Sequence, residues 1–124
     1  MDVLLSLLKE LCLTGLRIHF HCFSYPKSVA AEWIRVCPRV HFGITAQVMV
    51  SHDTSEVATW LPRDRLLLET DSPFLAPRGV GFHRNHPWHL RATAIHVARL
   101  RNVCLSLLLG QANANACALY DFPA

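Results

Sequence analysis

The sequence is poor in the residue types that mark several classes of protein. Its 5 glycines and 7 prolines among 124 residues are too few for a collagen-like chain or a flexible linker. The five cysteines are an odd number and include no Cys-x-x-Cys pair, which argues against a disulfide framework and a cysteine-based zinc ribbon. Charged residues make up 17%, and the net charge of +3 is too small to indicate a nucleic-acid partner by itself.

Long hydrophobic runs are also missing. No segment approaches the roughly 18 uninterrupted apolar residues of a membrane span. The first residues carry Asp2 and lack the positive start of a signal peptide. We therefore expect no membrane partner, a cytoplasmic or nuclear location, and reduced cysteines that pack as small hydrophobic residues.

Apolar residues and histidines are plentiful instead. The apolar fraction of 52% is enough for a packed core, and the length suits one modest domain. Eight histidines are many for this length, and they are the first indication of metal binding or acid–base chemistry.

The apolar pattern alternates between helices and strands. In the first helix Leu4, Leu7, Leu8 and Leu11 share one face, and we expect Gly15 to end it in a left-handed conformation. Helices are predicted at about 2–13, 26–37, 53–61, 87–101 and 105–120, and strands at 16–22, 39–45 and 65–70. This order predicts an α/β fold with about three parallel strands and flanking helices. A complete (β/α)₈ barrel needs roughly 200 residues or more, so we expect a partial TIM barrel or a small three-stranded layer.

Polar side chains follow two of the predicted strands. His19 and His21 end the first strand, and Glu69 and Asp71 end the third. Alternate residues of a strand point the same way, and active sites of parallel sheets lie at the carboxyl ends of the strands. We therefore expect these groups to converge at the mouth of neighbouring strands, where imidazole and carboxylate suit Zn²⁺, Mn²⁺ or Mg²⁺. A hydrogen-bonded histidine at the rim, and an Asp71 that caps a turn, are the plainer alternatives.

Three segments carry a resemblance to a known family. They are His21-Cys22-Phe23-Ser24, the eleven residues LLETDSPFLAP at 67–77, and Arg84-Asn85-His86-Pro87. They resemble the C-terminal motifs of the TatD-type metal-dependent deoxyribonucleases, which belong to the TIM-barrel metal-dependent hydrolases. The final Asn115–Tyr120 is similar to the last helix of that family. The resemblance implies that residues 1–124 are the C-terminal portion of a TatD-like hydrolase domain.

The resemblance also implies roles for single residues. His21 would bind the second of two divalent ions, and Asp71 would bind the first and position or deprotonate the attacking water. Glu69 would support these ligands without binding metal. Arg84 and Asn85 would lie in the loop on the substrate side, with Arg84 as a phosphate contact. The implied reaction is hydrolysis of DNA phosphodiesters with two Zn²⁺, Mg²⁺ or Mn²⁺ ions per complete site.

The match to the family pattern is incomplete. The family takes four of its six ligands from earlier strands, and His19-x-His21 cannot replace them because it occupies the position of the later motif. Tyr25 also stands where the family usually has glycine. We expect a truncated form of such a nuclease that is inactive alone.

Other functions stay open on the same residues. One alternative is an inactive interaction or nucleic-acid-binding module, and another is a structural α/β protein without a ligand. The open sheet edge would allow self-association. Five basic residues offer either a nucleic-acid contact or an ordinary solvated helix face: Arg78, Arg84, Arg91, Arg99 and Arg101.

Overall fold

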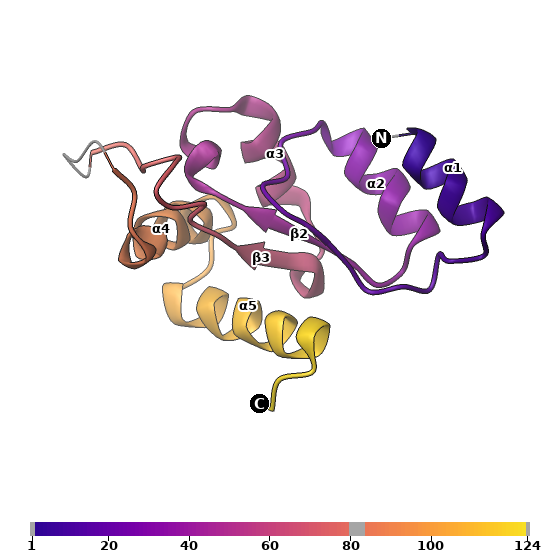
Figure 1. Ribbon diagram of the computed structural model, residues 1–124. Helices are drawn as coiled ribbons and strands as arrows, with labels where there is room; N and C mark the ends of the chain where they lie inside the picture. Colours follow the sequence, from indigo (N-terminus) through magenta and orange to yellow (C-terminus); the bar gives the residue numbers. More distant parts are fainter. Residues whose placement is uncertain (1, 80–83, 124) are drawn as a thin grey trace.

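Three parallel strands form the centre of the molecule (Figure 1). The computed structural model describes residues 2–79 and 84–123, so His83 of the eight histidines lies outside the described residues. The strands are β1 (Ile18–Phe20), β2 (Val40–Ile44) and β3 (Leu66–Leu68), paired in the order β1-β2-β3. The predicted α/β fold with three parallel strands is confirmed. The sheet is open, since β1 and β3 each pair on one side.

Helices follow the strands as the sequence pattern predicts. They are α1 (Asp2–Glu10), α2 (Lys27–Val36), α3 (His52–Trp60), α4 (Leu90–Leu100) and α5 (Leu105–Tyr120), with 3₁₀ turns at Ala46–Met49, Arg63–Arg65 and Pro87–His89. Across residues 2–79 and 84–123, no single helix is long and apolar enough to cross a membrane. Residues Pro87–Leu100 and α5 reach that length and composition only together, as a pair bent by 109°.

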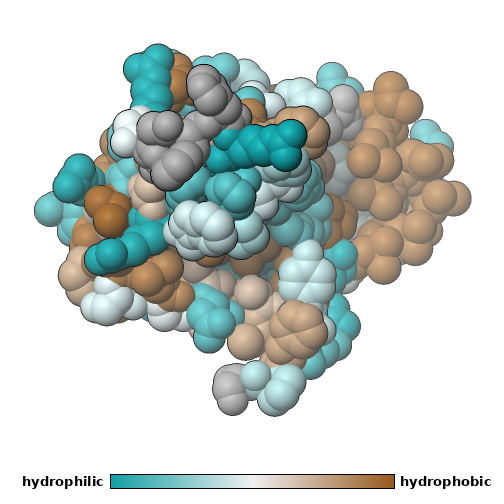
Figure 2. Space-filling model, turned by 60° about the vertical axis from the view of Figure 1, so that its left-hand side comes forward, coloured by the Kyte–Doolittle hydropathy of each residue, from teal (hydrophilic) through white to brown (hydrophobic). Residues whose placement is uncertain are grey.

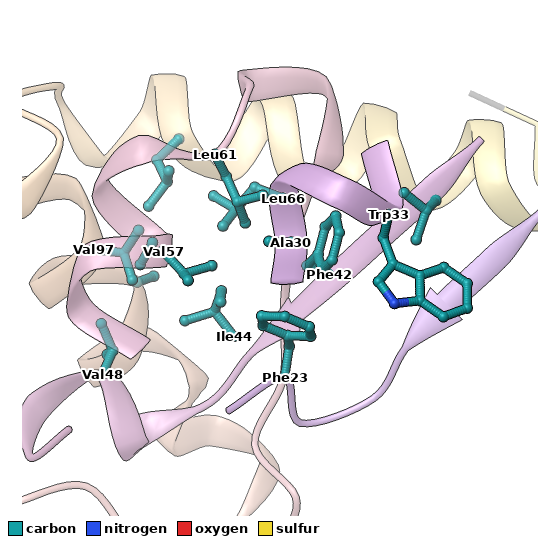
Figure 3. Packing of buried hydrophobic residues seen from close by; sticks show 14 of the residues in the cluster. Phe23, Ala30, Trp33, Phe42, Ile44, Val48, Val57, Leu61, Leu66 and Val97 are labelled. Atoms are coloured by element: carbon teal, nitrogen blue, oxygen red, sulfur yellow. The ribbon is translucent and has the colours of Figure 1, made fainter. Parts of the chain in front are cut away.

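The core lies around β2, whose five residues are all buried. Aromatic rings meet edge to face across it, with centroids 4.6 Å apart for Phe20 and Trp33 and 4.8 Å apart for Phe23 and Phe42. Figure 3 shows Trp33, Phe42 and Ile44 among the buried side chains. Burial of each large apolar side chain contributes about 1.5–3 kcal/mol. The core therefore holds β2, and with it the strand ends, in a defined position.

Two sets of polar contacts hold the last helices in place, one against the sheet and one against α3. The Asn115 amide of α5 donates to the carbonyls of Arg63 and Leu66 at 2.8 Å each, which ties α5 to the start of β3. The Arg101 guanidinium donates to the carbonyls of Ala58 (2.8 Å) and Leu61 (2.9 Å) at the end of α3. Burial lowers the pKa of Arg101. Arg101 is therefore a helix-capping residue, and it does not belong to the basic surface considered above.

The apolar face of α1 is oriented differently from the prediction. Leu5 is buried and Leu8 is partly buried against the core, whereas Leu4 and Leu7 are 48% and 46% exposed. Figure 2 shows this as an apolar surface over the part of the molecule where α1 lies. Of the predicted leucine stripe, only Leu8 contacts the core, and Leu4, Leu7 and Leu11 are exposed.

Three helices end in left-handed residues that are not glycine. Cys12 ends α1 with φ 55°, and the next residue donates its N–H to the Leu8 carbonyl at 2.9 Å. Asn102 (φ 53°) ends α4 and Asp121 (φ 57°) ends α5 in the same way. In each case the N–H of the next residue donates to a carbonyl of the helix. The prediction that Gly15 ends the first helix is wrong, because Cys12 already does so three residues earlier.

Candidate metal site

His21 and Asp71 lie close together at the carboxyl end of the sheet. Nε2 of His21 is 3.6 Å from Oδ1 of Asp71, and their side chains are 63% and 31% exposed. They come from different edges of the sheet, because β2 lies between β1 and β3. The expectation of neighbouring strands is therefore wrong, although the two side chains converge.

Gly43 of β2 explains how groups from the two edges meet. A Cβ atom added at residue 43 would overlap the carboxyl group of Glu69. The missing side chain leaves a passage over β2, and Glu69 uses it to reach from β3 to the end of β1. Any other residue at position 43 would close this passage.

Glu69 and His19 form an inner pair beneath the surface. Nε2 of His19 lies 2.6 Å from Oε1 of Glu69, and the Cys22 N–H donates to Oε2 at 2.7 Å. The other ring nitrogen of His19, Nδ1, is 2.5 Å from the Tyr120 hydroxyl of α5. Burial alone opposes ionisation of Glu69, but the contacts with His19 and the Cys22 N–H outweigh it and lower the pKa of Glu69. The inner pair thus places a carboxylate under the exposed groups without presenting it to solvent.

His21 and Asp71 form an outer pair, and Cys22 joins them. One nitrogen, one sulfur and one carboxylate oxygen of these three residues lie within 4.8 Å of one another. Burial raises the pKa of the Cys22 thiol; a hydrogen bond with Thr45 opposes the rise, and the negative charge of Asp71 adds to it. Cys22 was not among the residues predicted for the site. Its position directly after His21 was the available signal.

Two residues of this cluster have a left-handed backbone. Cys22 has φ 52° and Asp71 has φ 54°. This conformation costs about 1–2 kcal/mol for an ordinary L-residue, although aspartate tolerates it better. Such residues cluster at functional sites, where the surrounding structure holds them. Tyr25 is not left-handed, so the replacement of the family's glycine there does not strain the turn.

Asn85 holds the loop that follows Asp71. It is buried, and its amide nitrogen donates to the carbonyls of Thr70 (2.6 Å), Phe74 (2.7 Å) and Leu75 (3.2 Å). Its position therefore suits a support of the loop better than a contact with substrate. Arg84, in contrast, is exposed, and its contact with phosphate stays a prediction.

The outer pair fits a divalent cation by its geometry. Metal–nitrogen and metal–oxygen bonds of about 2.0–2.2 Å place two ligands of a tetrahedral ion about 3.4 Å apart. The observed 3.6 Å between His21 Nε2 and Asp71 Oδ1 is close to that separation. Both groups are also partly exposed, so a cation can reach them from solvent.

Parallel strands with flanking helices, and a group of potential metal ligands at the strand ends, are features of part of a TIM-barrel hydrolase. Residues 1–121 match the family model described as TatD related DNase, and the chain belongs to that family.

Individual relatives agree with the family match. The human protein named 3'-5' RNA nuclease TATDN2 is 30% identical over 123 residues, covering 95% of this chain and 16% of the relative. The uncharacterized metal-dependent hydrolase YabD of Bacillus subtilis is 31% identical over 100 residues, covering 81% and 39%. The crystal structure of the TatD homologue YJJV from Escherichia coli superposes with a TM-score of 0.83 at 25% identity, covering 98% of this chain and 47% of that one. The chain therefore spans less than half the length of these relatives.

Proposed function

We propose that this chain supplies the C-terminal part of a metal-dependent nuclease site that hydrolyses phosphodiesters of DNA. The separation of 3.6 Å between His21 and Asp71 carries the proposal, because it suits ligands of adjacent cations or of one shared cation. Divalent ions bound there would polarise the phosphate, acidify the water and stabilise the leaving oxygen.

The residues of the chain have distinct tasks in this proposal. The Asp71 carboxylate orients the attacking water and accepts its proton. The His21 imidazole would hold a cation through Nε2. Glu69 fixes the backbone of Cys22 and thereby the position of the preceding His21. Asn85 holds the loop of Asp71 in place. Arg84 provides a positive charge for a backbone phosphate.

Exposed aromatic residues near His21 and Asp71 in the sequence support a single-stranded substrate. Phe74, whose N–H donates to the Asp71 carbonyl at 2.9 Å, is 69% exposed. Tyr25, four residues after His21, is 46% exposed, and its ring lies 5.6 Å from that of Phe23. Unpaired bases stack on such rings with little sequence preference. RNA is the second substrate to test, since the relative TATDN2 is named an RNA nuclease.

The test is cleavage of single-stranded DNA and RNA oligonucleotides with Mg²⁺, Mn²⁺ or Zn²⁺. We expect no cleavage by residues 1–124 alone, because His21 and Asp71 are two of the six ligands that the family uses. We expect cleavage when the first strands of a relative such as YabD are joined ahead of them, and loss of cleavage on Asp71→Asn.

Two results would contradict the proposal. Cleavage by the joined protein that survives Asp71→Asn would remove Asp71 from the reaction. Asp71-dependent cleavage by the 124 residues alone would show that the missing ligands are not needed.

A further inference from the structure

We propose that Cys22 is a third protein ligand of the cation held by His21 and Asp71, and that it makes the site select Zn²⁺ over Mg²⁺. This inference rests on the cation site of the proposed function and adds a ligand to it. In residues 2–79 and 84–123, these three side chains form the one group of three potential ligands that lie within 4.8 Å of one another.

The distances suit a single ion. A metal–sulfur bond of about 2.3 Å and metal–nitrogen or metal–oxygen bonds of about 2.0–2.2 Å place tetrahedral ligands about 3.4–3.7 Å apart. The His21–Asp71 separation of 3.6 Å already meets this value. The ligand atoms of the whole group lie within 4.8 Å of one another, so they need to approach by at most about 1 Å to bind one ion. Rotation of the Cys22 and His21 side chains would bring them that much closer.

The backbone of Cys22 is held on both sides. Its own N–H donates to Glu69 Oε2 at 2.7 Å, and the N–H of the buried Phe23 donates to the Gly43 carbonyl at 2.9 Å. These bonds keep residue 22 in its left-handed conformation. The Cys22 sulfur lies within 4.8 Å of ligand atoms of His21 and Asp71, so it faces the outer pair. A site that is organised in this way loses little conformational entropy when it binds an ion.

The other cysteines provide a contrast. Cys37 is fully buried in the hydrophobic core, and Cys12 and Cys104 are exposed. Cys117 is half-buried in α5 but is not part of the group of potential ligands. Cys22 is half-buried at the carboxyl end of the sheet, with an imidazole and a carboxylate beside it. A structural role alone does not require those neighbours.

Binding would follow ordinary thiolate chemistry. The S–H bond of Cys22 breaks, a metal–sulfur bond forms, and the proton passes to solvent. Thiolate is a soft ligand that favours Zn²⁺ and Co²⁺, whereas Mg²⁺ prefers oxygen ligands. Without Cys22, one imidazole and one carboxylate remain, and these discriminate less among divalent ions.

The experiment is a Co²⁺ titration of the full chain in a reductant that does not bind metal. We expect a near-ultraviolet charge-transfer band that arises only from a thiolate–Co²⁺ bond. Cys22→Ser should abolish the band and weaken Zn²⁺ binding at least about tenfold, with Mg²⁺ binding unchanged. Cys104→Ser is the matched control, and it should keep both the band and the affinity.

The outcomes separate this inference from the proposed function. Co²⁺ binding that Asp71→Asn abolishes, but that gives no thiolate band, would overturn the role of Cys22 and leave the cation site intact. A wild-type chain that binds no Co²⁺ at all would overturn this inference, whereas the proposed function is decided by cleavage with the joined protein. Absence of the band is measured on the wild-type chain, so this contrary outcome does not depend on the folding of a variant.

Discussion

The inner pair and the outer pair are built from the same residue types in opposite ways. The side chains of His19 and Glu69 are 23% and 11% exposed. His21 and Asp71, two residues further along each segment, are 63% and 31% exposed and lie 3.6 Å apart. The two pairs are thus only two residues apart along the chain. The inner pair holds the strand ends together, and the outer pair is open to a cation. Residue type and spacing alone therefore do not distinguish the two pairs, whereas exposure to solvent does.

Removing one charge from each pair is the strongest test of this difference. Glu69→Gln weakens the contacts with His19 and the Cys22 N–H in a buried place, and we expect it to lower the free energy of unfolding by about 1.5–3 kcal/mol. Asp71→Asn keeps the size and the tolerance for a left-handed backbone, so we expect a change within about 0.5 kcal/mol. Urea denaturation without divalent ions measures both.

In cation binding, the order of the two effects should be reversed, with the larger loss in Asp71→Asn. Asp71→Asn removes a ligand and should abolish stabilisation by Zn²⁺, whereas Glu69→Gln should largely retain it. Equal losses of stability and of cation binding in the two variants would show that the pairs do not differ in role.

Gly43→Ala should disturb the inner pair next most strongly. The new methyl group overlaps the Glu69 carboxyl group and forces it out of its passage, and we expect a loss of about 1–3 kcal/mol in the free energy of unfolding. Gly110→Ala is the matched control: no atom lies within 4 Å of its added Cβ, and we expect a gain of about 0.5–1 kcal/mol in helix α5.

The double variant Gly43→Ala with Glu69→Gln tests the cause of that loss. If the methyl group acts through Glu69, the two effects are not additive, and the double variant is less damaged than the sum predicts. Additive losses would mean that Gly43 matters for another reason.

The stability contributed by Glu69 should depend on pH in a defined direction. Its pKa in the folded chain is lowered below the ordinary value of 4.5. The contribution is therefore fully present above that value and is lost as the pH falls through the lower folded pKa. We expect the stability difference between wild type and Glu69→Gln to shrink as the pH falls below 4.5. A difference that grows as the pH falls from 4.5 would refute the ionised state of Glu69.

The smallest expected effect is that of Tyr120→Phe. The variant removes the hydroxyl that meets Nδ1 of His19 at the exposed end of α5, and we expect a loss of about 0.5–1 kcal/mol. Thermal unfolding without metal measures this loss. Cation binding at the outer pair should stay unchanged, and a weakened affinity there would show that the inner pair also positions His21.

The sequence alone predicts much of this molecule, for identifiable reasons. The alternation of apolar stripes and strands predicts the parallel sheet, because periodicity depends on local spacing. The face of α1 is predicted wrongly, because an exposed and a buried leucine stripe look alike in sequence. The convergence of His21 and Asp71 follows from the chemistry of strand ends, and their roles as ligands stay a prediction.

Other features of the site depend on contacts between distant residues. The passage over Gly43 joins β2 to a carboxylate 26 residues later, and periodicity gives no sign of such a contact. Cys22 has no distinguishing pattern in the sequence, and its side chain comes to face Asp71 through a left-handed turn. Asn85 reads as a polar loop residue, yet burial makes it a support of that loop.

The left-handed residues that end α1, α4 and α5 are not equally suited to that backbone. Asn102 and Asp121 tolerate it, and Asp121 also pairs with Arg17 at 2.5 Å. Cys12 has neither advantage, so glycine there avoids a steric penalty of about 1 kcal/mol. The end of the first helix is therefore the place where one replacement should make the protein more heat-resistant without touching the strand ends.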